Sequence, residues 1–271
     1  MRTDTAGRLF VGGREALFLY EPDANNVYGP RRELYRFPQH TWVYDIAIRG
    51  DDVYVLTLSA LYVFPGLRAN PGVAQAHRLL FGVPLGHVHQ CFHGLAWGPD
   101  GYLYLSMGDP LWYYGDFNRP DHWGHWTFFS FDGFNAPTPY LFARTPYNGV
   151  GGVFRLLPDG TAFSVVSRGL RNSCGLTFDR HFNLFTNDND HEGLPAEYVP
   201  GRLVHVTPRS YFSWPRGWMV HKQPGRADML ETMNKNMGRA VPVGQSYYDE
   251  DFLPEEYRNN LLAVFAADGI G

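Results

Sequence analysis

Residues 93–109 read His-Gly-Leu-Ala-Trp-Gly-Pro-Asp-Gly-Tyr-Leu-Tyr-Leu-Ser-Met-Gly-Asp. In this stretch a short apolar strand leads into the tight turn Gly-Pro-Asp-Gly, and an alternating apolar strand follows the turn. Versions of the same pattern occupy 45–55 and 175–186, and 7–11 has the form of its second half. Strand–turn–strand units that return at intervals of about 40–50 residues are typical of the blades of a β-propeller.

The repeat predicts an all-β propeller of about five or six blades, each a four-stranded antiparallel sheet. We expect 1–271 to be a single propeller domain, truncated at both ends, because the chain opens inside a strand pattern and stops just after an apolar strand. Residues 110–150 lack alternation and are expected to be an aromatic-rich insertion, and 227–237 is the one predicted helix. Strands are expected at 8–11, 16–20, 42–48, 53–57, 60–64, 94–97, 102–106, 152–156, 162–166, 175–178, 183–186, 202–206 and 261–266.

The composition supports many short strands and argues against two classes of protein. The chain has 30 Gly and 20 Pro among 271 residues, which favours frequent turns. Its formal net charge of −4 argues against a general nucleic-acid binder. No apolar run approaches the roughly 20 residues that span a bilayer, and the first residues lack the apolar core of a signal peptide.

Three histidines precede the strand at 94–97, namely His87, His89 and His93. Imidazole suits proton transfer near neutral pH and also binds transition metals. The alternation of His87 and His89 would place both side chains on one face of an extended segment. The alternative is that all three are loop residues making ordinary hydrogen bonds.

A second candidate motif is Gly169-Leu-Arg-Asn-Ser-Cys-Gly-Leu176. When the repeats are aligned on Gly-Leu, Arg171 and Asn172 stand level with residues 90–91, so they would share a channel mouth with the histidines. An Arg and an Asn at that place can bind carboxylates or carbonyl oxygens. Alternatively, the Arg caps backbone carbonyls at the top of a blade.

The acidic segment Asn187-Asp-Asn-Asp-His-Glu-Gly193 follows another predicted strand. Asp188, Asp190 and Glu192 alternate, and carboxylate oxygens suit a hard cation such as calcium. An EF-hand does not account for the segment, because Val199 stands where the last loop ligand would be Glu. The alternative is a solvated acidic turn.

The insertion also contains a run of aromatic and histidine side chains that either stack on sugar rings or fill an irregular core. We expect His89, His93, Arg171, Asn172 and Asp188 to converge on one polar depression, with part of this run in its wall. The run comprises Trp112, Tyr113, Tyr114, Phe117, His122, Trp123, His125, Trp126, Phe128 and Phe129.

The ordered motifs resemble those of the glucose/sorbosone dehydrogenase propellers. The similarity is greatest to the membrane-bound dehydrogenase branch, which in planctomycete-type bacteria is often fused to a C-terminal haem domain. The resemblance implies a six-bladed propeller that uses pyrroloquinoline quinone and calcium to oxidise an aldose, sorbosone or other alcohol, in the periplasm or outside the cell. The segments that carry it are 89–109, 169–176, 184–192, 202–206, 240–244 and 253–261.

The resemblance also implies roles for individual residues. His89 or His93 would be the general base, Arg171 and Asn172 would contact the quinone and its carboxylates, and Asn189 would lie in the segment that contacts calcium and quinone. Arg171 and calcium would stabilise the developing oxyanion while hydride moves to the quinone. One departure is that Asp-Asn-Asp-His-Glu replaces the Glu, Gly and Pro of the enzymes.

Three functions therefore compete at this point. The first is a quinone- and calcium-dependent sugar or alcohol dehydrogenase that passes electrons to a haem domain outside this chain. The second is a non-catalytic propeller that binds a glycan or a protein, and the third is a calcium-dependent hydrolase of the lactonase kind. None of them involves nucleic acid.

Overall fold

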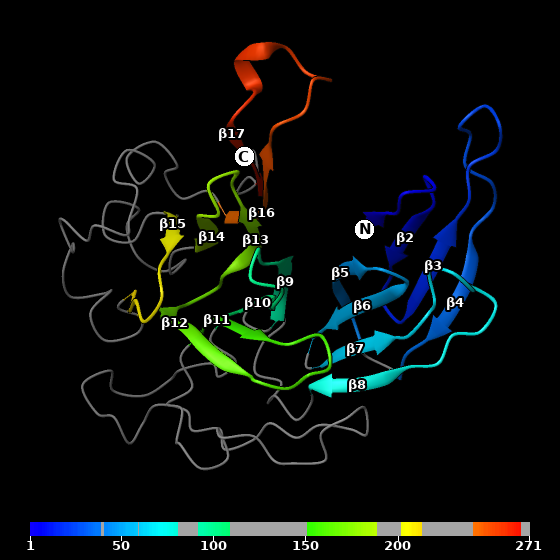
Figure 1. Ribbon diagram of the computed structural model, residues 1–271, viewed down its shortest axis with the longest axis horizontal. Coiled ribbons are helices and arrows are strands. Elements are labelled where there is room, and N and C mark those ends of the chain that lie inside the picture. Colours follow the sequence, from blue (N-terminus) through cyan, green and yellow to red (C-terminus); the bar gives the residue numbers. More distant parts are fainter. Residues whose placement is uncertain are drawn as a thin grey trace, which may run out of the picture. The chain divides into compact units, whose positions relative to one another are not determined.

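The computed structural model describes residues 1–38, 41–58, 60–80, 92–108, 151–188, 202–212 and 241–266. Over these ranges the chain forms antiparallel strands and one short 3-10 turn, η3 (Glu255–Tyr257), and no α-helix (Figure 1). No helix within the same ranges is long and apolar enough to cross a membrane. The contacts group the chain into two compact units, the first built mainly from 1–84 and the second mainly from 162–271 with 85–126 and 146–158.

The described residues of the first unit form two four-stranded sheets in which each strand pairs with the next along the chain. One sheet consists of β1 (Arg2–Thr3), β2 (Leu9–Gly12), β3 (Ala16–Tyr20) and β4 (Arg32–Arg36). The other consists of β5 (Val43–Arg49), β6 (Asp52–Thr57), β7 (Leu61–Phe64) and β8 (His77–Leu80). Both are the four-stranded antiparallel blades that the repeat predicted.

A shared apolar core joins the two sheets of the first unit. Phe10 and Leu19 of the first sheet pack in one cluster with Ile46, Val55 and Phe64 of the second, and all five side chains are buried. Alternating apolar positions produce this core, because every second side chain of a strand points to the same face.

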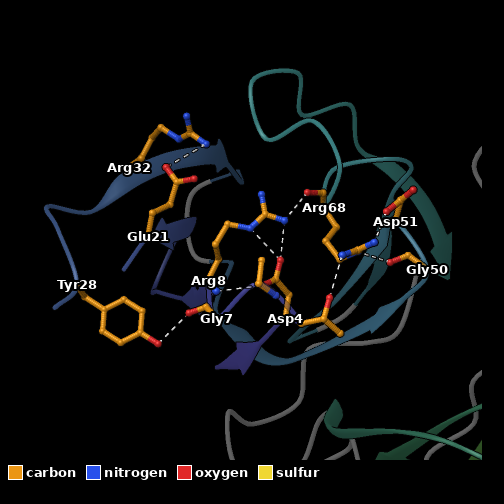
Figure 2. A network of polar contacts seen from close by, with 11 residues as sticks. Asp4, Gly7, Arg8, Glu21, Tyr28, Arg32, Gly50, Asp51 and Arg68 are labelled. Atoms are coloured by element: carbon orange, nitrogen blue, oxygen red, sulfur yellow. Dashed lines mark hydrogen bonds and ion pairs between the residues drawn. The ribbon is translucent and has the colours of Figure 1, made fainter. Parts of the chain in front are cut away.

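Polar contacts at the turns connect the same two sheets (Figure 2). The Asp4 carboxylate accepts hydrogen bonds from Nε and Nη2 of Arg8 at 2.9 and 2.6 Å and from the Arg8 amide at 2.9 Å. Arg8 Nη2 also donates to the Arg68 carbonyl at 2.6 Å, and Arg68 donates to Asp51 and to the Gly50 carbonyl. Burial acts to raise the pKa of Asp4, but the hydrogen bonds from Arg8 hold it below its ordinary value.

The described residues of the second unit form a four-stranded, a three-stranded and a two-stranded sheet. The four-stranded sheet has β9 (Phe92–Trp97), β10 (Leu103–Met107), β11 (Gly151–Leu156) and β12 (Ser164–Leu170). The three-stranded sheet has β13 (Cys174–Phe178), β14 (Leu184–Asp188) and β15 (Arg202–Val206). The two-stranded sheet is the hairpin of β16 (Val241–Tyr248) and β17 (Asn260–Ala266).

Glycines allow the first strands of these three sheets to approach one another closely. A Cβ atom added at Gly94 of β9 would lie 2.6 Å from Gly175 Cα of β13, where no side chain can be accommodated without a shift. Gly175 itself has φ +75°, and a Cβ there would lie 3.4 Å from Gly244 Cα of β16. The glycine of the Gly-Leu repeat is therefore a packing requirement between neighbouring sheets.

The described residues confirm the all-β prediction and every predicted strand, to within a few residues at the ends. Within the same residues four strands were not predicted: β1, β4, β8 and β16. The insertion at 110–150 and the helix at 227–237 lie outside the described residues, so both stay predictions.

Candidate functional site

His93 is the second residue of β9 in the second unit, and its imidazole is directed at the start of the neighbouring strand β13. Its Nδ1 lies 3.3 Å from the carbonyl oxygen of Ser173 and 3.5 Å from Sγ of Cys174. The Ser173 carbonyl can only accept hydrogen bonds, so this contact favours a proton on Nδ1. The ring nitrogen that carries the lone pair is then Nε2.

The turn before β13 brings Asn172 to the same place. Cys174 is a thiol and not half of a disulfide, and its Sγ is 3.7 Å from Oδ1 of Asn172 as well as 3.5 Å from the His93 ring. Ser173 Oγ pairs with Thr186 Oγ1 at 2.6 Å, and this bond fixes the middle of the turn to β14. Imidazole, thiol and amide therefore meet at the beginning of two adjacent strands.

Asp188, the last residue of β14, binds the backbone of the same turn. Its carboxylate accepts the backbone amide of Asn172 at 2.7 Å and that of Arg171 at 3.1 and 3.2 Å. It also accepts Nη2 of Arg202 at 2.8 Å. The side chain of Asp188 is fully buried and that of Arg202 is 4% exposed, so this is an ion pair inside the protein.

Arg171 and Asn172 are themselves 6% and 4% exposed. Arg202, which begins β15, is the cross-strand partner of Asp188 in the β14–β15 register and also donates to the Phe212 carbonyl at 3.1 Å. The turn, β14 and β15 thus form one connected polar structure in the second unit.

The structure brings together four of the residues predicted from sequence, namely His93, Arg171, Asn172 and Asp188. The others lie outside the described residues, and no group of three or more His, Cys, Asp or Glu that could hold a metal occurs within the described part of the chain. Those others are His87, His89, Asn189, Asp190, Glu192 and the aromatic run from Trp112 to Phe129.

Sequence reasoning missed Arg202 and the contact that Cys174 makes with His93. The sequence could have indicated the Cys174 contact, because Cys174 precedes the Gly-Leu of its repeat in the same way that His93 precedes the Gly-Leu at 94–95. For Arg202 the only indication in the sequence is that a charged residue begins an otherwise apolar predicted strand. A charge in that position has to be paired if the strand is buried.

The comparisons with known proteins agree with this architecture. No family model matches the sequence, and no curated protein matches it. The solved structures that match include the quinone-bound aldose sugar dehydrogenase of Streptomyces coelicolor, with a TM-score of 0.55 and 20% identity over 90% of this chain and 70% of that one. An oxidoreductase of Thermus thermophilus, described as a glucose dehydrogenase, has a TM-score of 0.58 and 17% identity over 99% and 84%.

A third match is the calcium structure of a family AA12 carbohydrate-active enzyme of Trichoderma reesei, with a TM-score of 0.55 and 12% identity over 91% and 69%. The chain has a β-propeller fold. It shares this fold with quinone-dependent sugar dehydrogenases at low sequence identity, and a shared fold does not by itself establish a shared chemistry.

Proposed function

We propose that this propeller oxidises a sugar or another alcohol with pyrroloquinoline quinone, as a member of the glucose/sorbosone dehydrogenase type. The observation that carries the proposal is the meeting of His93 with Asn172 and Cys174 at the start of two neighbouring strands. An alcohol dehydrogenase needs a base and polar binding groups within a few ångströms of one reacting carbon.

The donor set of this site fits a quinone that carries carboxylates. Arg171 and Asn172 belong to one buried turn, and a guanidinium and an amide together bind carboxylate and carbonyl oxygens in a water-poor setting. Arg171 and Asn172 would hold the cofactor, and Asn189 would extend that contact. When bound, the quinone supplies the two-electron acceptor for the substrate hydride.

His93 would act as the base. Because the Ser173 carbonyl favours a proton on Nδ1, the lone pair lies on Nε2, which takes the proton of the substrate hydroxyl as the C–H bond breaks. Arg171 would stabilise the negative charge that develops on oxygen in the transition state. His89 remains the alternative base, in which case His93 would orient the site.

Calcium fits less well at Asp188. Among the described residues, the hydrogen bonds that this buried carboxylate accepts come from two amides and a guanidinium, and a ligand to calcium needs a lone pair directed at the ion. Asp190 and Glu192 remain the proposed calcium ligands.

The wider setting of the proposal follows the resemblance. Residues 1–271 would form one propeller domain with 110–150 inserted, of the membrane-bound dehydrogenase branch and located in the periplasm or outside the cell. The substrate would be an aldose or a sorbosone-like sugar, and a haem domain outside this chain would receive the electrons.

Reconstitution with the quinone and calcium, followed by a scan of aldoses with an artificial electron acceptor, tests the function. We expect turnover in the wild type and a loss of at least about 100-fold in kcat in His93→Gln, the range over which a general base contributes. His181→Gln is the matched control, since His181 is an exposed histidine in the β13–β14 turn.

Quinone binding is measured separately by optical titration. Binding that persists in His93→Gln while turnover falls would support a base, because the imidazole acts on the substrate proton. A wild-type protein that binds no quinone, or a His93→Gln variant as active as His181→Gln, would contradict the proposal in favour of a binding propeller.

A further inference from the structure

The buried carboxylate of Asp188 is surrounded by donors. Two backbone amides and one guanidinium approach its two oxygens in four contacts between 2.7 and 3.2 Å. The Arg171 amide is shared between both oxygens, so three donors meet a carboxylate that has about four lone-pair sites. The side chain has no exposed surface through which a further partner could arrive.

The donors come from two sides of the second unit. Arg171 and Asn172 offer successive N–H groups from the β12–β13 turn, and successive amides pointing at one anion are a known anion-binding arrangement. Arg202 approaches from β15 and supplies the only charge among these donors. The Asp188 carboxylate therefore connects the β12–β13 turn to β15.

Arg202 is in turn fixed by the segment that follows β15. Its Nη2 donates to the Phe212 carbonyl at 3.1 Å, and the Phe212 amide donates to the Arg168 carbonyl of β12 at 2.8 Å. The backbone of Phe212 thus links the Arg202 guanidinium to β12.

A cation at Asp188 would have to displace these groups. Calcium binds carboxylate oxygens at about 2.3–2.6 Å, so it would lie within a few ångströms of the Arg202 guanidinium inside the protein. Like charges at such a distance repel strongly where water does not screen them. The alternation of acidic residues at 188–192 therefore does not make Asp188 a ligand.

We infer that Asp188 is a positioning residue, which together with Arg202 fixes the turn that carries Arg171 and Asn172 and does not ligate calcium. The effect of this turn on the cofactor rests on the proposed function. The fixed position of the turn is independent of the proposed function, because it is inferred from hydrogen bonds between Asp188, Arg202 and the turn itself.

Hydrogen–deuterium exchange at the amides of residues 171 and 172 measures the turn directly. Asp188→Asn offers one oxygen in place of two and no charge, and we expect both amides to exchange about tenfold faster or more. Arg202→Met is expected to have the same effect, and Arg202→Lys to restore slow exchange because it keeps the charge. Leu184→Ala, at the other end of β14, is the control for a general loss of stability.

Calcium titration by calorimetry separates positioning from ligation. We expect Asp188→Asn to bind calcium like the wild type, and calcium to leave the two amides of the wild type as protected as before. Loss of calcium binding in Asp188→Asn, or faster exchange at 171 and 172 when the wild type takes up calcium, would overturn the inference. Amide exchange in the wild type with and without calcium distinguishes positioning from ligation even if no variant folds.

Quinone titration adds the readout that depends on the proposed function. We expect Asp188→Asn to bind the quinone more weakly than a Leu184→Ala protein of equal melting temperature, and Arg202→Lys to recover most of the affinity. Equal quinone affinity in Asp188→Asn and Leu184→Ala would overturn the positioning role. A wild type that binds no quinone would instead refute the proposed function, and the exchange and calcium results would still decide the role of Asp188.

Discussion

Gly94→Ala is expected to destabilise the second unit because β9 and β13 pass too close for a side chain. The added Cβ would lie 2.6 Å from Gly175 Cα, 2.8 Å from Gly175 C and 2.9 Å from Leu176 N. Carbon atoms in ordinary contact are about 3.5–4.0 Å apart, and all three neighbours are backbone, so the strands must separate by about 1 Å. Overpacking of this kind costs about 1–3 kcal/mol.

Gly244→Ala is the matched control at the equivalent place in β16. A Cβ there meets nothing within 4 Å, so the alanine should be tolerated and should gain about 0.4–1 kcal/mol from the reduced freedom of the unfolded chain. One kcal/mol moves the melting temperature of a domain of 150–250 residues by about 2–4 °C. We expect thermal unfolding of Gly94→Ala to occur at least about 2 °C below wild type, and that of Gly244→Ala at or slightly above it. Equal melting of the two variants would refute the reasoning from close approach.

Three further predictions concern charges and a phenol. Arg202→Met should lower the unfolding free energy in urea by about 3–5 kcal/mol because it leaves Asp188 buried without a cation, and adding Asp188→Asn should recover much of that loss. Burial, with the Asp52 charge beside it, raises the pKa of Tyr54 to about 12, so the folded state keeps the phenol proton to higher pH than the unfolded state does. Stability should therefore fall between about pH 10 and 12, and Tyr54→Phe should reduce the fall. A double-mutant cycle of Asp100→Asn and Arg155→Met should give a coupling of only about 0.2–1 kcal/mol, because both side chains are about a third exposed; a larger coupling would contradict the solvent-screened picture.

The sequence predicted the strands that bury an alternating apolar face and missed those that do not. β9 and β10 follow directly from the apolar strand, the Gly-Pro-Asp-Gly turn and the alternating strand at 93–109. By contrast, β4 reads Arg-Glu-Leu-Tyr-Arg and is largely exposed, since it is an outer strand that pairs on one side only. Its apolar residues Leu34 and Tyr35 are adjacent, partly buried and flanked by charged residues, so they give no alternation for periodicity to identify.

The candidate site was likewise predicted only in part from the sequence. Aligning the repeats on Gly-Leu predicted that Asn172 would lie near His93, because equivalent positions of adjacent sheets are neighbours in space. The burial of Asp188 could not be predicted, because its partner Arg202 is separated from it by a segment that the pattern does not organise. An alternation of acidic residues is the same in sequence whether the first of them faces solvent or the interior.

The polar network at the turns of the first unit has a consequence for how the protein responds to salt. Arg68 and Asp51 pair at the surface, with side chains 27% and 52% exposed, whereas the Asp188–Arg202 pair of the second unit is buried. Mobile ions screen charges that water reaches and have little effect on charges that it does not. Raising the ionic strength should therefore weaken the Arg68–Asp51 pair, which holds the segment after β7 to the β5–β6 turn, and leave the β12–β13 turn unchanged, so that salt acts as a selective probe of one unit.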